Sequence, residues 1–286
     1  MREVTPEVHM VACTDTFPDA MQHPSLGSED WESDSMNGSD ELIEFGGKLC
    51  YKSFEAGVNP NVKKVRRDSE EYIGNILKQH HGSVLEHASV SFVLLNVSRI
   101  LTHELVRHRA GCAYSQESMR YVRYTEVPLW IPASLSVEYL SGAPYEAAKA
   151  AGSDSAHKLS SRQWGEFIRD HYLYSIRHIC GEYELLQKFM TSNLALDNMS
   201  NFTVKKIYTS AIRRACPSGV ATSILMTANH RAWRHVIEMR STEHVEEETR
   251  MVAIEIGRQL KNKFLNIYQD MEQAIDGTWT FLNSKV

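Results

Sequence analysis

Arginine is concentrated in one stretch of this chain, residues 99–123, which reads RILTHELVRHRAGCAYSQESMRYVR. The stretch holds five arginines and no lysine, together with two histidines and two glutamates. A guanidinium offers a planar fork of donors that suits phosphate and carboxylate, whereas lysine is a mobile point charge. Because apolar residues flank these arginines, we expect an anion-binding site built into the core of an enzyme.

The overall charge of the chain bears on which ligands these arginines bind. The formal net charge is −5 and the pI is about 6.2, so the whole chain does not attract nucleic acid. A nucleic-acid-binding module that uses these arginines on phosphates is an alternative. Against this alternative, aromatic residues are not interleaved with the basic ones. The alternative predicts nucleic-acid binding that depends steeply on salt, and a colourless protein.

Two other interpretations of the arginines compete with a ligand site. One is a structural network of ion pairs that joins Arg107 and Arg109 to Glu104 and Glu117. The other is a zinc site, because His103 and the glutamate after it begin like the metalloprotease pattern H-E-x-x-H. The fifth position is Arg107, a cation where the metal would sit, so we expect no metal.

A helix and an extended segment are expected to position these side chains. Ser98 should cap a helix over residues 99–108, which places Arg99, His103 and Arg107 close to one face. Gly111 should end that part of the chain.

After the glycine, Gln116, Ser118 and Arg120 alternate with other residues, as in an extended segment that presents polar groups on one side. Ser118 has no histidine base beside it and reads as a hydrogen-bonding residue. Cys112 reads as an inert thiol.

Periodicity predicts the remaining elements. Strands are expected near residues 7–14, 88–97, 121–127 and 221–228. Helices are expected over 42–51, 69–80, 164–190, 202–215, 231–240 and 245–271. A loop is expected over 24–40, and short helix and loop over 136–155. There is no internal repeat and no clear linker. We therefore predict a single α+β domain over 1–286, in which long helices pack on a mixed, mostly antiparallel sheet.

The location follows from cysteine usage and hydropathy. Five cysteines are scattered without a CxxC pair, which fits a reducing compartment. The N-terminal residues lack a signal-peptide run, and nowhere do 18 apolar residues follow one another. We expect a soluble cytoplasmic protein without membrane contact.

Arg107-His108-Arg109 followed by Ser118 resembles the signature of the flavin-dependent thymidylate synthases, the ThyX family. That family usually places seven residues between the two parts and this chain has eight, so the extra residue falls near Ala110–Ala113. The resemblance covers roughly residues 80–125 and 205–260. Its further motifs are His81–His87, Thr102–Arg107, Tyr114–Tyr121, Arg213 four residues before Pro217, Asn229–His235 and Met239-Arg240.

The resemblance implies a methyltransferase that converts dUMP to dTMP for dTTP synthesis. Carbon would come from 5,10-methylenetetrahydrofolate and hydride from FAD reduced by NADPH. It also implies a homotetramer with active sites at subunit interfaces and no nucleic-acid partner. A flavoprotein reductase with another substrate and an inactive homologue remain as rival interpretations.

The family motifs imply roles for individual residues. Arg240 would be the catalytic arginine at the uracil ring that favours ionisation at N3. Residues that would contact dUMP are Arg99, Glu104, Leu105, Val106, Arg107, Gln116, Glu117, Ser118, Met119, Arg120, Arg213 and Arg240. Residues that would contact FAD are His81, Ser83, Glu86, Arg107, His108, Arg109, Asn229, His230, Arg231 and His235.

Helix geometry adds a prediction of its own. Arg231 and Arg240 are nine residues apart, so on a straight helix they point to nearly opposite sides. If Arg231 meets FAD and Arg240 meets dUMP, one helix would serve two active sites, which requires an oligomer.

Overall fold

The computed structural model describes residues 1–57, 59–62, 64–284 and 286. Its chain divides into two compact units. Unit 1 comprises residues 1–7, 95–103 and 116–224, and unit 2 comprises residues 8–94, 104–115 and 225–286. Each unit contains segments that are far apart in the sequence. The unit boundaries fall inside one helix and four strands: α4 (Arg99–Leu105), β2 (Glu7–Cys13), β3 (Ser89–Ser98), β4 (Cys112–Gln116) and β6 (Ala221–Asn229). The prediction of one domain over 1–286 stays a prediction.

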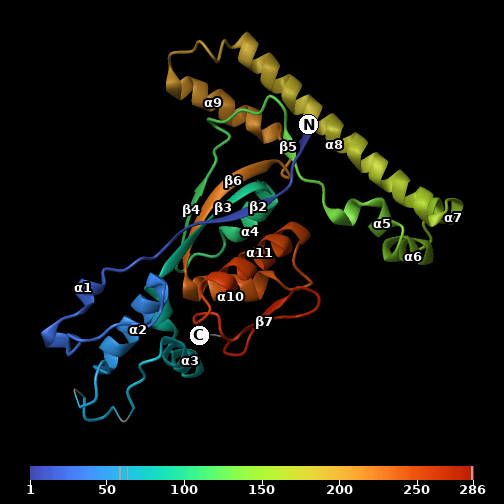
Figure 1. The fold of residues 1–286 in the computed structure, drawn as a ribbon. Coiled ribbons are helices and arrows are strands. Elements are labelled where there is room, and N and C mark those ends of the chain that lie inside the picture. Colours follow the sequence, from blue (N-terminus) through green and yellow to red (C-terminus); the bar gives the residue numbers. More distant parts are fainter. Residues whose placement is uncertain (58, 63, 285) are drawn as a thin grey trace. The chain divides into compact units, whose positions relative to one another are not determined.

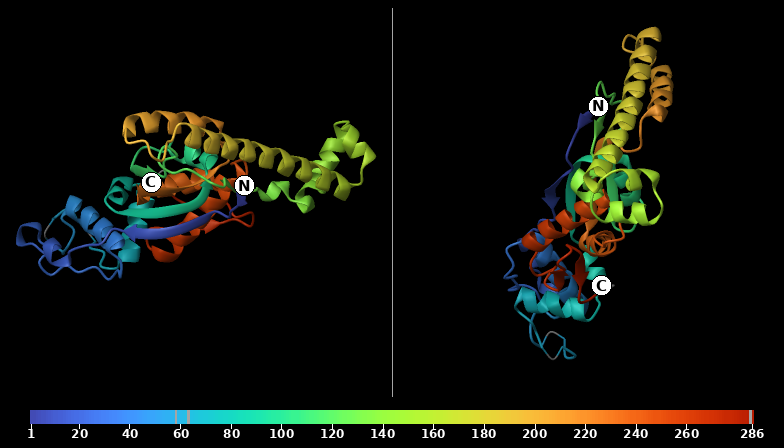
Figure 2. Two further views of the ribbon diagram at one scale, coloured as in Figure 1. Left: turned by 90° about the horizontal axis from the view of Figure 1, so that it is seen from above. Right: turned by 90° about the vertical axis from the view of Figure 1, so that its right-hand side faces the viewer.

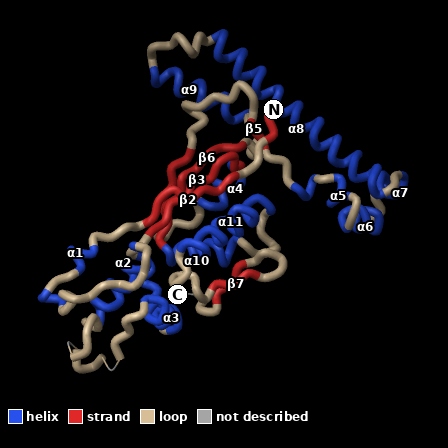
Figure 3. The backbone as a smooth tube through the Cα atoms, viewed as in Figure 1, coloured by secondary structure: helices blue, strands red, loops and turns tan. Residues whose placement is uncertain are grey.

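A four-stranded sheet contains three of the four predicted strands, those near 7–14, 88–97 and 221–228, together with one strand that was not predicted (Figures 1 and 3). Its order is β2-β3-β6-β4, with bounds Glu7–Cys13, Ser89–Ser98, Ala221–Asn229 and Cys112–Gln116. Hydrogen bonds at the strand ends show antiparallel neighbours. In unit 2, Thr14 N donates to Ser89 O (2.9 Å) and Asn229 N to Gly111 O (3.0 Å). The short β1 (Arg2–Glu3) and β5 (Pro128–Leu129) pair in parallel. This confirms the prediction of a mixed, mostly antiparallel sheet.

Unit 1 is mainly helical, and its longest helix is α8, Ser161–Asn193. The helix begins at a capping box, in which Ser160 and Gln163 satisfy each other's backbone N–H groups. Helix α9 (Phe202–Ile212) lies alongside its C-terminal half, and three short helices lie at its N-terminal end (Figure 2). Those are α5 (Val137–Leu140), α6 (Ala143–Ala150) and α7 (Asp154–Lys158), with 3-10 turns η3 (Ala133–Leu135) and η4 (Arg213–Ala215) elsewhere in the unit.

Unit 2 packs helix α10 (His230–Arg240) on its own part of the sheet. Trp233 is fully buried, its ring meets Phe92 edge-on at 5.2 Å, and its Nε1 donates to Val90 O (3.0 Å). These contacts fix the start of α10. The other elements are α1 (Pro18–Met21), η1 (Pro24–Leu26), α2 (Gly38–Tyr51), α3 (Ser69–Lys78), η2 (Gly82–Glu86), α11 (Glu247–Lys263), β7 (Met271–Gln273) and β8 (Trp279–Phe281).

The helix before the arginine-rich loop is shorter than predicted. Helix α4 runs from Arg99 to Leu105, and Ser98 Oγ accepts from Leu101 N (3.1 Å), so the predicted cap is confirmed. The helix ends before Arg107, because Tyr114 Oη donates to the carbonyls of Leu105 and His108, each at 2.8 Å. The prediction that Arg107 continues the face of Arg99 is therefore wrong.

Two other predicted elements are also wrong. A turn replaces the strand over 121–127, with Tyr121 N and Val122 N both donating to Ser118 O (2.9 Å), so the chain is extended only as far as Gln116. The last helix stops at Lys263 instead of Met271, and the chain continues into the hairpin β7–β8. Among the described residues, no helix combines the length and apolar character that a membrane span requires.

Candidate functional site

A pocket of about 360 Å³ in unit 2 brings together most of the residues predicted to hold a flavin. The loop after α4 forms one side, and the end of β6 with the first turns of α10 forms the other. The lining residues are Glu86, Arg107, His108, Arg109, Ala110, Gly111, Cys112, Asn229, Arg231, Ala232, His235 and Val236.

Gly111 and Asn229 fix the geometry of the pocket. Gly111 has φ +68°, and a Cβ there would lie 2.4 Å from Asn229 Nδ2, so only glycine fits. Asn229 Oδ1 accepts from Ala232 N (2.8 Å) and thereby caps α10. The N-terminus of α10 thus opens on the pocket, where the helix dipole favours an anion.

Three arginines give the pocket a positive character. Arg107 and Arg109 lie on the loop, and Arg231 lies in the first turn of α10. Arg231 is paired with Glu86 (2.5 Å), and its Nε also donates to Val286 O (3.1 Å). Glu86 also lines the pocket, so an incoming anion would compete with it for Arg231.

His108 is held in its neutral form at the same pocket. Arg240 Nε donates to His108 Nε2 (3.0 Å), which leaves Nδ1 as the protonated ring nitrogen. Burial, with the nearby cations Arg240, His235 and Arg107, lowers the pKa of His108 to about 4. The imidazole is therefore a hydrogen-bonding group near neutral pH and adds no charge.

Glu104 links two of the predicted arginines. Its Oε2 lies 3.0 Å from Arg240 Nη1 and 3.5 Å from Arg107 Nη1. Part of the ion-pair alternative is thus present around Glu104. The Arg240 side chain is only 16% exposed, whereas that of Arg107 is 67% exposed and remains available to a ligand.

The faces of α10 are only partly as predicted. Trp233 and Ile237 are buried, while Arg231 and His235 are exposed. Arg240, however, reaches His108, which lines the same pocket as Arg231. Arg240 itself is not among the residues that line that pocket, so the prediction that the two arginines serve different active sites stays a prediction.

Seven of the predicted nucleotide-binding residues lie in unit 1: Arg99, Gln116, Glu117, Ser118, Met119, Arg120 and Arg213. Arg99 Nη2 donates to Glu117 O (3.2 Å), and Gln116 Nε2 donates to Thr102 Oγ1 (3.1 Å). The buried Arg99 Nε has no hydrogen-bond partner among the described residues. A buried guanidinium N–H without a partner is costly, so it marks a place where a ligand oxygen would fit.

Other predicted residues are less well placed. In unit 1, the Met119 side chain is in the core at 4% exposure, while Arg120 and Ser118 lie on the turn and Arg213 is exposed on η4. In unit 2, Leu105 is buried and Val106 is exposed.

The last flavin candidates lie outside the main pocket. His81 and Ser83 line a neighbouring pocket that also includes Arg231, and Tyr51 stacks on His81 with ring centroids 6.1 Å apart. His230 is a correction. Its side chain is fully buried, with the ring against Phe264 and its Nδ1 3.1 Å from Tyr268 Oη, so it does not line the pocket.

Sequence reasoning missed some of what shapes the pocket. The fit between Gly111 and Asn229 and the bond from Arg240 to His108 join residues far apart in the chain, so no local pattern indicates them. The cap by Asn229 did have a local signal, because asparagine directly before a helical run is a common N-cap.

Comparisons with known proteins agree with this geometry. The family model described as Thymidylate synthase complementing protein (Thy1) matches residues 33–264. A flavin-dependent thymidylate synthase of Mycobacterium sp. (strain JLS) is 34% identical over 254 residues, which cover 87% of this chain and 86% of that protein. The enzyme of the same name from Mycobacterium avium (strain 104) is 32% identical over 287 residues, 97% and 96% of the two chains.

A solved structure shows the same fold. It is a UMP/dUMP methylase, PolB from Streptomyces cacaoi, bound with 5-Br dUMP, with a TM-score of 0.60 at 15% identity over 94% of this chain and 96% of that one. The likeness shows that the two chains share an α+β fold. The chain belongs to the Thy1 family.

Proposed function

We propose that this chain is a flavin-dependent thymidylate synthase, a methyltransferase that converts dUMP to dTMP. The main support is that most of the residues predicted to hold a flavin line one pocket, in a chain that belongs to the Thy1 family. The co-substrates would be 5,10-methylenetetrahydrofolate and NADPH, and the cofactor FAD.

The pocket fits part of an FAD molecule. The pyrophosphate is an anion, and Arg107, Arg109 and Arg231 supply guanidinium donors for it beside the positive end of the α10 dipole. A volume of about 360 Å³ is near the lower limit for ligand pockets, and a dinucleotide is a large ligand. The rest of the cofactor would therefore need surfaces beyond this pocket.

Arg240 is the proposed catalytic residue. Its guanidinium is held by Glu104 and His108 at 3.0 Å each, so it would not have to reorganise as charge develops. A fixed guanidinium beside uracil N3 or an enolate-like oxygen stabilises the anion without a proton transfer of its own. Arg99, Arg213 and the segment 116–120 would bind the nucleotide, with the unpaired Arg99 Nε as one donor.

Electron balance distinguishes this reaction from the folate-only one. A methylene carbon needs two electrons to become a methyl group. When bound, the flavin supplies them as hydride. The folate is then not oxidised and leaves as tetrahydrofolate, whereas a folate-only enzyme would release dihydrofolate.

The proposal includes an assembly and a location. We propose a homotetramer whose active sites draw residues from neighbouring subunits, because the pocket of one chain is small for the whole cofactor. A cytoplasmic setting suits this chemistry and the scattered cysteines, all of which are free.

The first test is the visible spectrum of the purified chain and its response to dUMP. Bound flavin should absorb blue light, and dUMP should perturb that band. Arg109→Ala should weaken flavin retention by about tenfold or more, since one charged hydrogen bond is worth about 1.5–3 kcal/mol. Arg162→Ala is the control, because that exposed arginine on α8 pairs only with Glu166 in the same helix.

Each alternative function gives another result. Flavin that does not respond to dUMP favours a reductase with another substrate. A colourless protein that binds DNA with steep salt dependence favours the nucleic-acid-binding module, and either result contradicts the proposal.

A further inference from the structure

Helix α8 carries apolar side chains on the side that faces away from its own core. Its inner side holds Cys180 and Tyr183, which are buried. On the outer side, Phe167, Tyr174, Leu185 and Phe189 are 50%, 72%, 62% and 62% exposed. At 100° per residue these four fall within an arc of about 60°, opposite the buried side. We call these four residues the outer stripe.

Gly181 lies in the same helix at the edge of the outer stripe. Apart from its chain neighbours and the nearby backbone of its own helix, no atom of the described chain lies within 4 Å of where its Cβ would be. Glycine inside a helix costs about 1 kcal/mol relative to alanine, and nothing in this chain uses the space. A glycine at such a point allows the backbone of another helix to approach closely.

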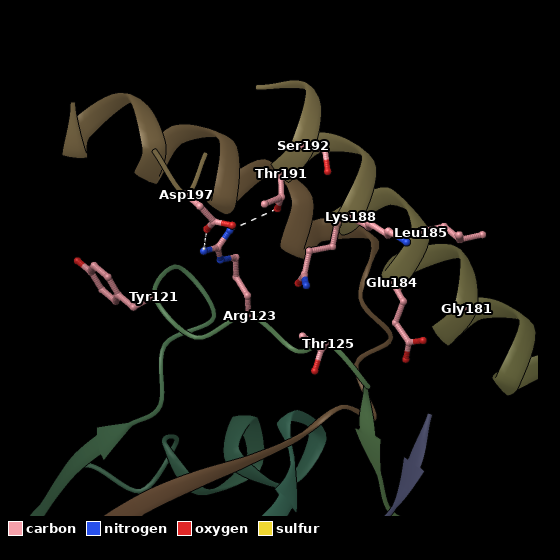
Figure 4. Close-up of a pocket in the computed structure, with 11 residues that line it drawn as sticks. Tyr121, Arg123, Thr125, Gly181, Glu184, Leu185, Lys188, Thr191, Ser192 and Asp197 are labelled. Atoms are coloured by element: carbon pink, nitrogen blue, oxygen red, sulfur yellow. Dashed lines mark hydrogen bonds and ion pairs between the residues drawn. The ribbon is translucent and has the colours of Figure 1, made fainter. Parts of the chain in front are cut away.

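A groove of about 790 Å³ runs beside the outer stripe (Figure 4). Gly181, Leu185 and Lys188 of α8 line one side, and the loop with Tyr121 and Arg123 lines the other. The residues that line it carry equal numbers of positive and negative side chains, and Arg123 is already paired with Asp197. It therefore offers no charge excess to a small anion, and its open shape beside an apolar stripe suits a protein surface.

We infer that the outer stripe of α8 packs antiparallel against α8 of a second copy of this chain. The register that places Tyr174 opposite Leu185 of the second copy puts His178 opposite Gly181. It also places Arg177 beside Glu184 at the flank of the seam, twice by symmetry. The surface is thus complementary to itself, as an interface between identical subunits must be.

Other registers of the same seam are disfavoured by charge. A shift of one heptad in one direction brings Arg177 beside Arg177 of the other copy, and a shift in the other direction brings Glu184 beside Glu184. Each costs a like-charge contact in place of two ion pairs. A lipid surface is a poorer occupant, because Asp170, Glu182 and Glu184 flank the stripe and anionic headgroups would repel them.

The helix pair would be one part of a larger interface. From Phe167 to Phe189 the stripe is about 33 Å long, and a helix is about 10 Å wide. The product, roughly 330 Å² per copy, is below the about 800 Å² per partner of a standard stable interface. Disrupting the stripe should therefore remove one interface of an assembly and leave the folded subunit intact.

The first experiment measures the mass of the full chain by light scattering after size exclusion. Tyr174→Glu with Leu185→Glu should halve the assembly mass at micromolar concentration, with unchanged circular dichroism. The control is Leu265→Glu, since Leu265 is 64% exposed but lies in unit 2 outside any helix. An unchanged mass for the folded double variant would overturn the inference.

The second experiment tests the register by exchange of charge. Arg177→Glu alone should weaken association at least fivefold, and adding Glu184→Arg should restore most of it. Restoration by Glu182→Arg instead would indicate a parallel pair and overturn the antiparallel arrangement. Gly181→Leu places a side chain where the second helix approaches, so it should weaken association. Leucine has a higher helix propensity than glycine, so the helix itself should not be harmed. All three readouts are masses and do not depend on activity, so they are separate from the proposed function.

Discussion

At the scale of single residues, the contact between Arg240 and His108 is the most informative one in the pocket. It joins the proposed uracil arginine to a residue that lines the proposed flavin pocket, across 3.0 Å. Binding of either ligand can therefore affect binding of the other through one hydrogen bond.

Removal of Arg240 should change the titration of His108. Burial and the Arg240 charge lower the pKa of His108 to about 4, so Arg240→Ala should raise it toward the usual value near 6.5. Histidine C–H signals in NMR spectra report this pKa. Arg258→Ala is the control, since the Arg258 side chain is 55% exposed and pairs with Glu255 of the same helix, α11. An unmoved His108 titration in Arg240→Ala would refute the coupling.

His230 should make stability depend on pH. It is fully buried and its pKa is lowered to about 3, so the unfolded state binds a proton that the folded state rejects. Stability is then present above about pH 6.5 and falls as the pH drops toward 3, by at most about 1.4 kcal/mol per pH unit. His108 acts in the same sense down to about pH 4.

Urea unfolding at pH 7, 6 and 5 measures this dependence. His230→Phe keeps an aromatic ring between Phe264 and Tyr268 and removes the titrating group. It should cost about 1–3 kcal/mol at pH 7, because Tyr268 Oη loses its partner, and it should flatten the slope. An equally steep slope in the variant would show that other groups carry it.

At the scale of elements, two asparagine caps allow a matched comparison. Asn229 caps α10 at the pocket, and Asn201 caps α9 in the same way, with bonds of 2.8 and 3.1 Å. Either change to alanine should cost about 1 kcal/mol of stability. Only Asn229→Ala should also weaken flavin binding, by severalfold, and equilibrium dialysis measures this. Equal flavin affinity in the two variants would show that the start of α10 is not part of the proposed site.

The helices and strands also show what local sequence could and could not predict. Long periodic elements such as α8 and β6 follow from their own residues, and Ser98 caps α4 as its type suggests. The end of α4 was not predictable, because it is set by Tyr114 from the next strand.

The segment 121–127 shows the same limit. It alternates like a strand, yet Gln187 Nε2 from α8 binds the carbonyl of Tyr124 (2.8 Å) where a neighbouring strand would. Tertiary contacts decided both cases. The residues predicted to hold a flavin are indicated only by ordered family motifs.

At the scale of the whole molecule, the proposed sites are shared among subunits. If so, Arg231→Ala and Arg240→Ala subunits, each inactive alone, should regain activity when unfolded and refolded together. Some mixed assemblies would then contain a site with both arginines intact. The control is each variant refolded with itself, and a mixture no more active than these would place both arginines in sites formed within one chain.

The most direct test of the central claim is product analysis with dUMP, methylenetetrahydrofolate, NADPH and FAD. The account predicts equal amounts of dTMP and tetrahydrofolate, with one NADPH oxidised per dTMP and no turnover without flavin. Formation of dihydrofolate, or turnover that continues without flavin and NADPH, would contradict it.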